Sequence, residues 1–223
     1  MQKNGHSPLI IGHRGSSALA PENTLAAFEK AIEDGADGLE LDVRLAKDGV
    51  PVVFHDATLR RIAGKRVRVI NVNSEEFQTL DVGSWFNLKY PNKFNSKFSQ
   101  ERIPTLEKFL DFLGDYKGLV YLELKCKESE IPQLVKSVTE IVKKSKLFAN
   151  ITIKSFALEA VAWTNKLLPE VHTAALFAPK IMTLLDKQVY LIEKAQECKA
   201  DELSLHFSLA TYKLVESAAS QGL

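Results

Sequence analysis

Short apolar segments alternate with amphipathic segments along most of the chain. The apolar segments have the length and composition of β-strands, and they cover residues 8–13, 38–43, 51–56, 119–125, 151–156, 171–177 and 201–207. Between most of them, apolar side chains recur with a period of about 3.6 residues, which is typical of helices. This alternation predicts a parallel sheet joined by helical crossovers. Seven candidate strands favour a (β/α) barrel over an open, doubly wound sheet.

Residues that begin and end helices support this interpretation. The first predicted helix follows Asn23 and Thr24, either of which can cap its start, and Gly35 lies where a left-handed residue commonly ends a helix. The later segments 103–114 and 132–145 are also amphipathic, and each has a proline near its start. The helical crossovers are therefore predicted by their boundaries as well as by their periodicity.

The third candidate strand breaks the pattern. Only seven residues separate Val43 from Pro51, whereas a parallel crossover normally needs about a dozen or more. Either Asp48 and Gly49 turn a hairpin, which makes the third strand antiparallel, or the chain returns in extended form to a parallel strand. We expect the parallel arrangement, because it brings His55 to the same end of the sheet as the charged residues described below.

Composition narrows the possible classes of protein. The chain has 223 residues, 45% of them hydrophobic, with a formal net charge of +1, so it can bury a large core and gives no sign of a nucleic-acid or anionic-membrane partner. Cys126 and Cys198 match no metal-binding or redox spacing, which indicates reduced thiols. No apolar run approaches the ~20 residues of a membrane span, and the first residues lack a signal-peptide pattern. We expect a cytoplasmic protein without stable membrane insertion.

Carboxylates lie at the ends of two predicted strands. Glu40 and Asp42 point to the same side of their strand because strand side chains alternate with a period of two, and Glu123 and Lys125 have the same spacing. Taken alone, such residues are usually solvated or ion-paired, and Lys125 could simply neutralise Glu123. In a barrel, however, the carboxyl ends of the strands meet at one face, where active sites are built.

The same face would receive His13 and Arg14 from the first strand and His55 from the third. A lone histidine is more often structural than catalytic, and Arg14 could simply balance the charge of Glu22 or Asp42. The coincidence of carboxylates, histidines and cations at the ends of four strands nevertheless indicates a functional site.

This set of side chains suits chemistry at phosphorus. Three carboxylates, those of Glu40, Asp42 and Glu123, form an all-oxygen ligand set for a hard divalent cation, Mg²⁺ or Ca²⁺. Arg14 and Lys125 would hold phosphate oxygens. Two histidines can divide the acid and base roles. The residues therefore predict metal-assisted phosphoryl transfer or phosphodiester cleavage.

At these residues the chain resembles the glycerophosphodiester phosphodiesterase family. The resemblance rests on five motifs in a fixed order, namely HRG at 13–15, PENT at 21–24, ELDV at 40–43, KDG at 47–49 and HD at 55–56. It implies a phosphodiesterase-type TIM (β/α) barrel with an insertion after the third strand. We accordingly expect one catalytic domain over residues 1–223, with the insertion at about 57–103, either as a loop over the site or as a satellite cluster.

The resemblance also implies roles for the site residues. The acid/base pair would be His13 and His55; the metal ligands would be Glu40, Asp42 and Glu123; and the phosphate contacts would be Arg14 and Lys125. Members of the family cleave glycerophosphodiesters to glycerol 3-phosphate and an alcohol through a cyclic phosphodiester. The sequence does not assign which histidine acts first as the base.

The chain departs from the family pattern in two places. Ala46 replaces a usual threonine, and after residues 201–207 there is one more helical segment but no eighth strand. We therefore expect a barrel that lacks its eighth strand and helix, with open edges at the first and seventh strands and reduced stability. Three readings stay open: a hydrolase of small glycerophosphodiesters, a lysophospholipase D acting on lysolipids, and a truncated barrel that binds phosphate compounds without turnover. A homo-oligomer is also left open.

Overall fold

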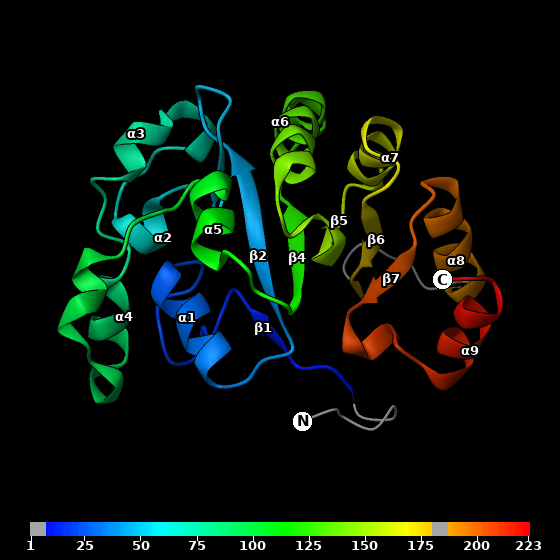
Figure 1. Ribbon diagram of the computed structural model, residues 1–223, viewed down its shortest axis with the longest axis horizontal. Helices are drawn as coiled ribbons and strands as arrows, with labels where there is room; N and C mark the ends of the chain where they lie inside the picture. Colours follow the sequence, from blue (N-terminus) through cyan, green and yellow to red (C-terminus); the bar gives the residue numbers. More distant parts are fainter. Residues whose placement is uncertain (1–7, 180–186) are drawn as a thin grey trace. The chain divides into compact units, whose positions relative to one another are not determined.

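The computed structural model describes residues 8–179 and 187–223 (Figure 1). Its contacts divide the chain into two compact units, residues 1–121 and residues 122–223. Each unit has strands and helices of its own. The single domain predicted over residues 1–223 stays a prediction.

The strands of the first unit are arranged around β2. They are β1 (Ile11–His13), β2 (Gly38–Leu45), β3 (Pro51–Val53) and the first residues of β4 (Leu119–Leu124). β1 and β2 are parallel, with His13 opposite Glu40. The start of β4 lies on the other side of β2, where the Leu119 amide donates to the Asp37 carbonyl at 3.1 Å.

Helix α1 (Leu25–Glu33) connects β1 to β2, and its ends follow the predicted rules. Of the two candidate caps, Thr24 fills the position and its side chain accepts a hydrogen bond from the Ala27 amide. Gly35 follows the helix with a φ of 79°, in the left-handed region expected after a helix end. Asn23 instead contacts Asp42, as described with the site below.

The prediction of a parallel third strand is wrong. β3 pairs antiparallel with β2, with Val53 opposite Val43. The Gly49 amide donates to the Ala46 carbonyl at 3.0 Å, and Gly49 has a φ of 81°, so the segment turns as a tight hairpin. The physical reason is length, because seven residues are too few for a helical crossover between parallel strands.

Residues 57–103 fold as short helices over a hydrophobic cluster. The helices are α2 (Arg60–Ala63), η1 (Val69–Asn71), α3 (Ser74–Phe77), α4 (Ser84–Lys89), η2 (Pro91–Lys93) and η3 (Ser96–Gln100), followed by α5 (Leu106–Leu113). Leu59, Val69 and Phe77 pack with Val52 and Phe54 of the hairpin in one buried cluster. The segment is therefore a packed satellite of the sheet; its limits as an insertion stay a prediction.

The second unit alternates strands and helices as the sequence pattern predicts. After the last residues of β4 come η4 (Glu128–Glu130), α6 (Ile131–Lys144), η5 (Phe148–Asn150), β5 (Ile151–Ser155), α7 (Leu158–Leu167), β6 (His172–Phe177), α8 (Lys187–Glu197), β7 (Glu202–Leu205), η7 (Phe207–Leu209) and α9 (Tyr212–Ser220). β5, β6 and β7 are parallel neighbours in chain order. The Ser155 hydroxyl joins β5 to the end of β4 by donating to the Leu124 carbonyl at 2.8 Å.

Two expected absences concern only the part of the chain that the structure describes. Residues 8–179 and 187–223 contain no strand after β7, in agreement with the missing eighth strand. Among the helices of those same residues, none combines the length and the apolar character needed to cross a bilayer. The predicted cytoplasmic location stays a prediction.

The core of the first unit provides a stability test. The rings of Phe28 on α1 and Phe109 on α5 are fully buried, with centroids 4.6 Å apart. Replacing Phe109 by Ala should lower the free energy of unfolding by about 3–5 kcal/mol, because it leaves a cavity between the two helices. Urea denaturation measures this, with Phe112→Ala as the control, since Phe112 lies on the same helix and is 38% exposed. Equal losses in the two variants would contradict this packing.

Candidate active site

Two carboxylates are buried side by side on β2. Glu40 and Asp42 are 3% and 0% exposed, and they project from alternate positions of the strand. His13 ends β1 opposite Glu40, and its Nε2 atom lies 3.8 Å from Glu40 Oε2. The His13 side chain is 64% exposed, so it connects the buried carboxylates with solvent.

The backbone turns sharply directly after β1. Arg14 has a φ of 58°, a left-handed conformation that is uncommon for a residue with a side chain. Its amide donates to the Glu40 carbonyl at 2.8 Å and its carbonyl accepts from the Asn23 amide at 3.1 Å. Gly15 follows with a φ of 76°, and a Cβ atom there would lie 2.5 Å from the Ala27 carbonyl. The HRG motif thus needs its glycine so that Arg14 can turn toward β2.

Arg14 and Asn23 hold the Asp42 carboxylate from two sides. Arg14 Nε lies 3.1 Å from Asp42 Oδ2, and Asn23 Nδ2 donates to the same oxygen at 2.9 Å. Asn23 Oδ1 in turn accepts from the Asp42 amide at 3.3 Å. Sequence reasoning treated Asn23 only as a candidate helix cap, although its place in the PENT motif was a usable indication of a site role.

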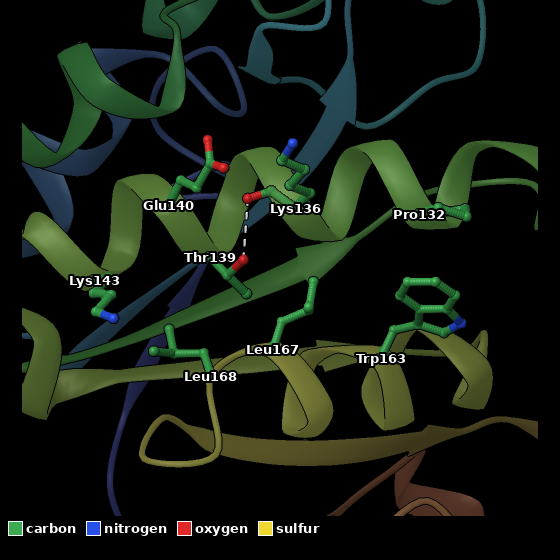
Figure 2. Close-up of a pocket in the computed structure, with 8 residues that line it drawn as sticks. All are labelled: Pro132, Lys136, Thr139, Glu140, Lys143, Trp163, Leu167 and Leu168. Atoms are coloured by element: carbon green, nitrogen blue, oxygen red, sulfur yellow. Dashed lines mark hydrogen bonds between the residues drawn. The ribbon is translucent and has the colours of Figure 1, made fainter.

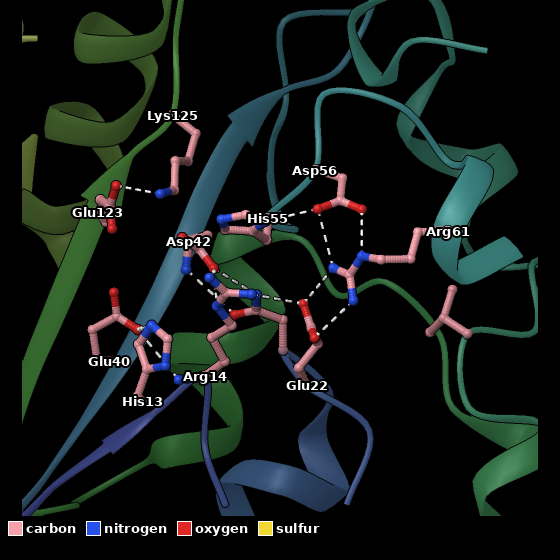
Figure 3. A network of polar contacts seen from close by, with 12 residues as sticks. His13, Arg14, Glu22, Glu40, Asp42, His55, Asp56, Arg61, Glu123 and Lys125 are labelled. Atoms are coloured by element: carbon pink, nitrogen blue, oxygen red, sulfur yellow. Dashed lines mark hydrogen bonds and ion pairs between the residues drawn. The ribbon is translucent and has the colours of Figure 1, made fainter. Parts of the chain in front are cut away.

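The hairpin places His55 in the same region. Because β3 runs antiparallel to β2, the chain returns past the end of β2, and the Phe54 amide donates to the Asp42 carbonyl at 2.9 Å. His55 therefore follows directly after the residue whose amide is bonded to Asp42, and its Nδ1 atom faces the Asp56 carboxylate (Figure 3). The parallel strand that we expected is not needed to bring His55 there.

Arg61 connects two further carboxylates in this region. Its guanidinium binds Glu22 through Nη1 and Nη2, at 2.9 and 2.7 Å, and Asp56 through Nε and Nη2, at 2.7 and 3.0 Å. Glu22 also accepts from Arg14 Nη1 at 3.0 Å, and Asp56 Oδ1 lies 2.7 Å from His55 Nδ1. Figure 3 shows the continuous network. Sequence reasoning named Glu22 only as a possible charge partner of Arg14, and it missed Asp56 and Arg61, although the residues after HD were visible in the motifs.

The guanidinium groups keep both network carboxylates ionised. Burial alone would raise the pKa of Glu22, but the hydrogen bonds and charges of Arg61 and Arg14 lower it overall. The pKa of Asp56 is lowered in the same way: burial opposes ionisation, and the contacts with Arg61 and His55 outweigh it. An ionised carboxylate can only accept hydrogen bonds, so His55 Nδ1 carries the proton that faces Asp56.

The remaining predicted site residues, Glu123 and Lys125, belong to residues 122–223. Glu123 lies in β4 and is 5% exposed, and Lys125 Nζ forms an ion pair with its carboxylate. The Lys125 ammonium also lies over the Phe156 ring, 5.5 Å from its centroid. Within this unit the two residues are therefore paired, as one of the sequence-based alternatives proposed.

A separate pocket lies between α6 and α7 in the second unit (Figure 2). Its lining residues are Pro132, Lys136, Thr139, Glu140, Lys143, Trp163, Leu167 and Leu168. None of the predicted site residues is among them. The pocket combines an apolar wall with two lysines, whereas the groups suited to acid/base chemistry lie around β2.

Replacing Glu22 by Gln tests the electrostatics of the network. The folded-state pKa of Glu22 lies below its ordinary value of 4.5. Its ionisation therefore stabilises the fold fully above about pH 4.5, and this contribution is lost as the pH falls through the folded-state value. The free energy of unfolding of the wild type should thus fall more steeply with acidification than that of Glu22→Gln.

Urea denaturation across acidic and neutral pH measures the two slopes. Glu29→Gln, at an exposed position of α1, is the matched control and should follow the wild type. Parallel curves for the wild type and Glu22→Gln would contradict this description of the network.

Comparison with known proteins agrees with the geometry. The sequence matches the Glycerophosphoryl diester phosphodiesterase family over residues 13–223. It is 37% identical over 169 residues to a glycerophosphodiester phosphodiesterase of Caldanaerobacter subterraneus subsp. tengcongensis, covering 76% of this chain and 66% of that protein. It is 32% identical over 180 residues to one of Bacillus subtilis, covering 78% and 61%. The chain thus spans less than two thirds of these two relatives.

Solved structures show the same fold. A phosphodiesterase of Oleispira antarctica, in complex with the product sn-glycerol-3-phosphate, matches with a TM-score of 0.82 at 28% identity, covering 96% of this chain and 81% of that chain. The predicted phosphodiesterase-type TIM barrel is thereby confirmed as the fold class. On the family match and these relatives, the chain belongs to the glycerophosphoryl diester phosphodiesterase family.

Proposed function

We propose that the chain hydrolyses glycerophosphodiesters to glycerol 3-phosphate and an alcohol. The observation that carries the proposal is the grouping of His13, Arg14 and His55 around two buried carboxylates of β2. Membership of the family supports the reaction, and a structural relative of Oleispira antarctica holds glycerol 3-phosphate as its product. The substrate is a small molecule, and a nucleic-acid partner is not expected from the near-neutral charge.

We assign the acid/base roles to His13 and His55. Because His55 Nδ1 donates to the ionised Asp56, its Nε2 is the acceptor in the neutral ring, the form that a general base needs. His55 would remove the proton of the glycerol 2-hydroxyl as its oxygen attacks phosphorus, and His13 would protonate the departing alcohol. The resulting cyclic phosphodiester is opened by water with the two roles exchanged.

The donor set fits a hard divalent cation. Glu40 and Asp42 supply buried carboxylate oxygens, and we propose that Glu123 completes a ligand set for Mg²⁺ or Ca²⁺. Such a cation, when bound, stabilises negative charge that develops on the phosphate oxygens. Arg14 and Lys125 would bind these oxygens directly. Arg14 is already oriented for this by Asp42 and Glu22.

A leaving-group experiment tests the two histidine roles separately. His55→Ala should lower the release of the alcohol by about 100-fold or more from both glycerophosphocholine and glycerophospho-p-nitrophenol. His13→Ala should lower it by a similar factor with choline, but far less with p-nitrophenolate, because that group leaves without a proton. The rate of alcohol release in a single turnover measures this, because it reports the first step alone, and His206→Ala serves as an exposed control. Equal sensitivity of both variants to the leaving group would contradict the assignment.

The cation requirement is tested by binding as well as by activity. Chelation should abolish turnover, and Mg²⁺ or Ca²⁺ should restore it. Asp42→Asn should weaken cation binding by more than tenfold in calorimetry, because it removes a charged ligand, whereas Asp34→Asn at an exposed helix end should not. Unchanged cation affinity in Asp42→Asn would contradict the site.

The same assay decides among the other readings. Turnover of a lysophospholipid but not of glycerophosphocholine would assign a lysophospholipase D. Binding of glycerol 3-phosphate without turnover of either would indicate a barrel that binds phosphate compounds only.

A further inference from the structure

We propose that Arg61 is a positioning residue of this site, which fixes the His55 imidazole through Asp56 and the Arg14 guanidinium through Glu22. The inference rests on the proposed phosphodiesterase function, and it assigns a role in that function to the segment of residues 57–103. The hydrogen bonds of Arg61 go to Glu22 and Asp56, so it acts on the reacting groups through these two partners.

All three nitrogen atoms of the Arg61 guanidinium donate hydrogen bonds. Nε and Nη2 form a fork on Asp56, while Nη1 and Nη2 form a second fork on Glu22. Only an arginine offers planar N–H groups on two edges, so a lysine could neutralise charge here but could not fix two carboxylate planes at once. The pKa of Arg61 is raised further by these partners, so the fork stays charged.

The first arm of the network, from Arg61 through Asp56, ends on His55. Asp56 lies between Arg61 and the imidazole, and its Oδ1 atom is 2.7 Å from His55 Nδ1 and 3.0 Å from Arg61 Nη2. Arg61 therefore holds the acceptor that selects the Nδ1–H tautomer, which leaves Nε2 for proton transfer. Without the fork, Asp56 can rotate and the imidazole loses a fixed orientation.

The second arm of the network, from Arg61 through Glu22, ends on Arg14. Glu22 Oε1 accepts from Arg61 Nη2 at 2.7 Å and from Arg14 Nη1 at 3.0 Å. With Nη1 on Glu22 and Nε beside Asp42, the Arg14 guanidinium is held on two sides. In the proposed function its other N–H groups bind phosphate oxygens. The fork of Arg61 thus orients the carboxylate that orients Arg14.

The fork is itself anchored by the hydrophobic cluster of residues 57–103. Arg61 lies on α2 between the buried Leu59 and Ile62, and its Cζ atom lies over the Trp85 ring, 5.9 Å from the centroid. Trp85 is fixed in turn, because its Nε1 donates to the Val82 carbonyl at 2.8 Å. The satellite cluster therefore sets where the guanidinium stands.

The test compares Arg61→Ala with Arg60→Ala, which removes an exposed arginine from the neighbouring position of α2. We expect Arg61→Ala to lower kcat/KM for glycerophosphocholine by about 10–100-fold, the usual effect of losing a residue that orients groups in the site, with Arg60→Ala within about twofold of the wild type. The ¹⁵N spectrum of His55 should change from the Nδ1–H tautomer to a mixture in Arg61→Ala only. Arg61→Lys should keep the charge but recover only part of the activity.

Two single-arm variants keep the test decisive if Arg61→Ala fails to fold. Asp56→Asn should mix the His55 tautomers and lower kcat, whereas Glu22→Gln should weaken glycerol 3-phosphate binding and leave the tautomer unchanged. Arg61 would be purely structural if its variants lowered the melting temperature but left the His55 tautomer and kcat like those of Arg60→Ala, and that result overturns the proposal. If the wild type hydrolyses no glycerophosphodiester, the proposed function fails, while the His55 spectrum still decides the role of Arg61.

Discussion

The burial of two carboxylates on one strand is the constraint on which the rest of the first unit depends. Glu40 and Asp42 are almost entirely removed from solvent, and an uncompensated buried charge is among the most unfavourable features that a fold can contain. The charge of Asp42 is compensated by Arg14 and Asn23, whose side chains both contact it. The backbone of both residues is in the left-handed conformation. Such strained positions persist where surrounding contacts fix them, and they are common at functional sites.

From that constraint a layered arrangement follows. The Arg14 guanidinium is held in place by Glu22. Glu22 is itself a partly buried charge, and Arg61 balances it. The same Arg61 then fixes Asp56 beside His55. Charges of opposite sign therefore alternate from the strand outward to the helices of residues 57–103. Each group neutralises its neighbour and fixes the orientation of that neighbour's side chain. A packed segment outside the sheet becomes part of the same electrostatic unit.

Much of this could be predicted from the sequence because it follows from local rules. Period-two alternation placed Glu40 and Asp42 on one side of a strand, and capping rules placed the ends of α1. The direction of β3 was predicted wrongly, because the grouping of His55 with the other residues was taken to need a parallel strand, while the short connection was the better guide. Arg61 was missed because its role depends on two side chains brought together only by the folded hairpin and satellite cluster.

We propose that this arrangement performs phosphodiester hydrolysis. Phosphorus NMR of glycerophosphocholine, incubated with the purified chain and Mg²⁺ or Ca²⁺, tests it most directly, because substrate, cyclic phosphodiester and product give separate resonances. We predict a transient cyclic phosphodiester signal followed by accumulation of glycerol 3-phosphate, and neither signal when His55 is replaced by Ala. A substrate resonance that persists unchanged with the cation present, or product formation that survives the loss of His55, would contradict it.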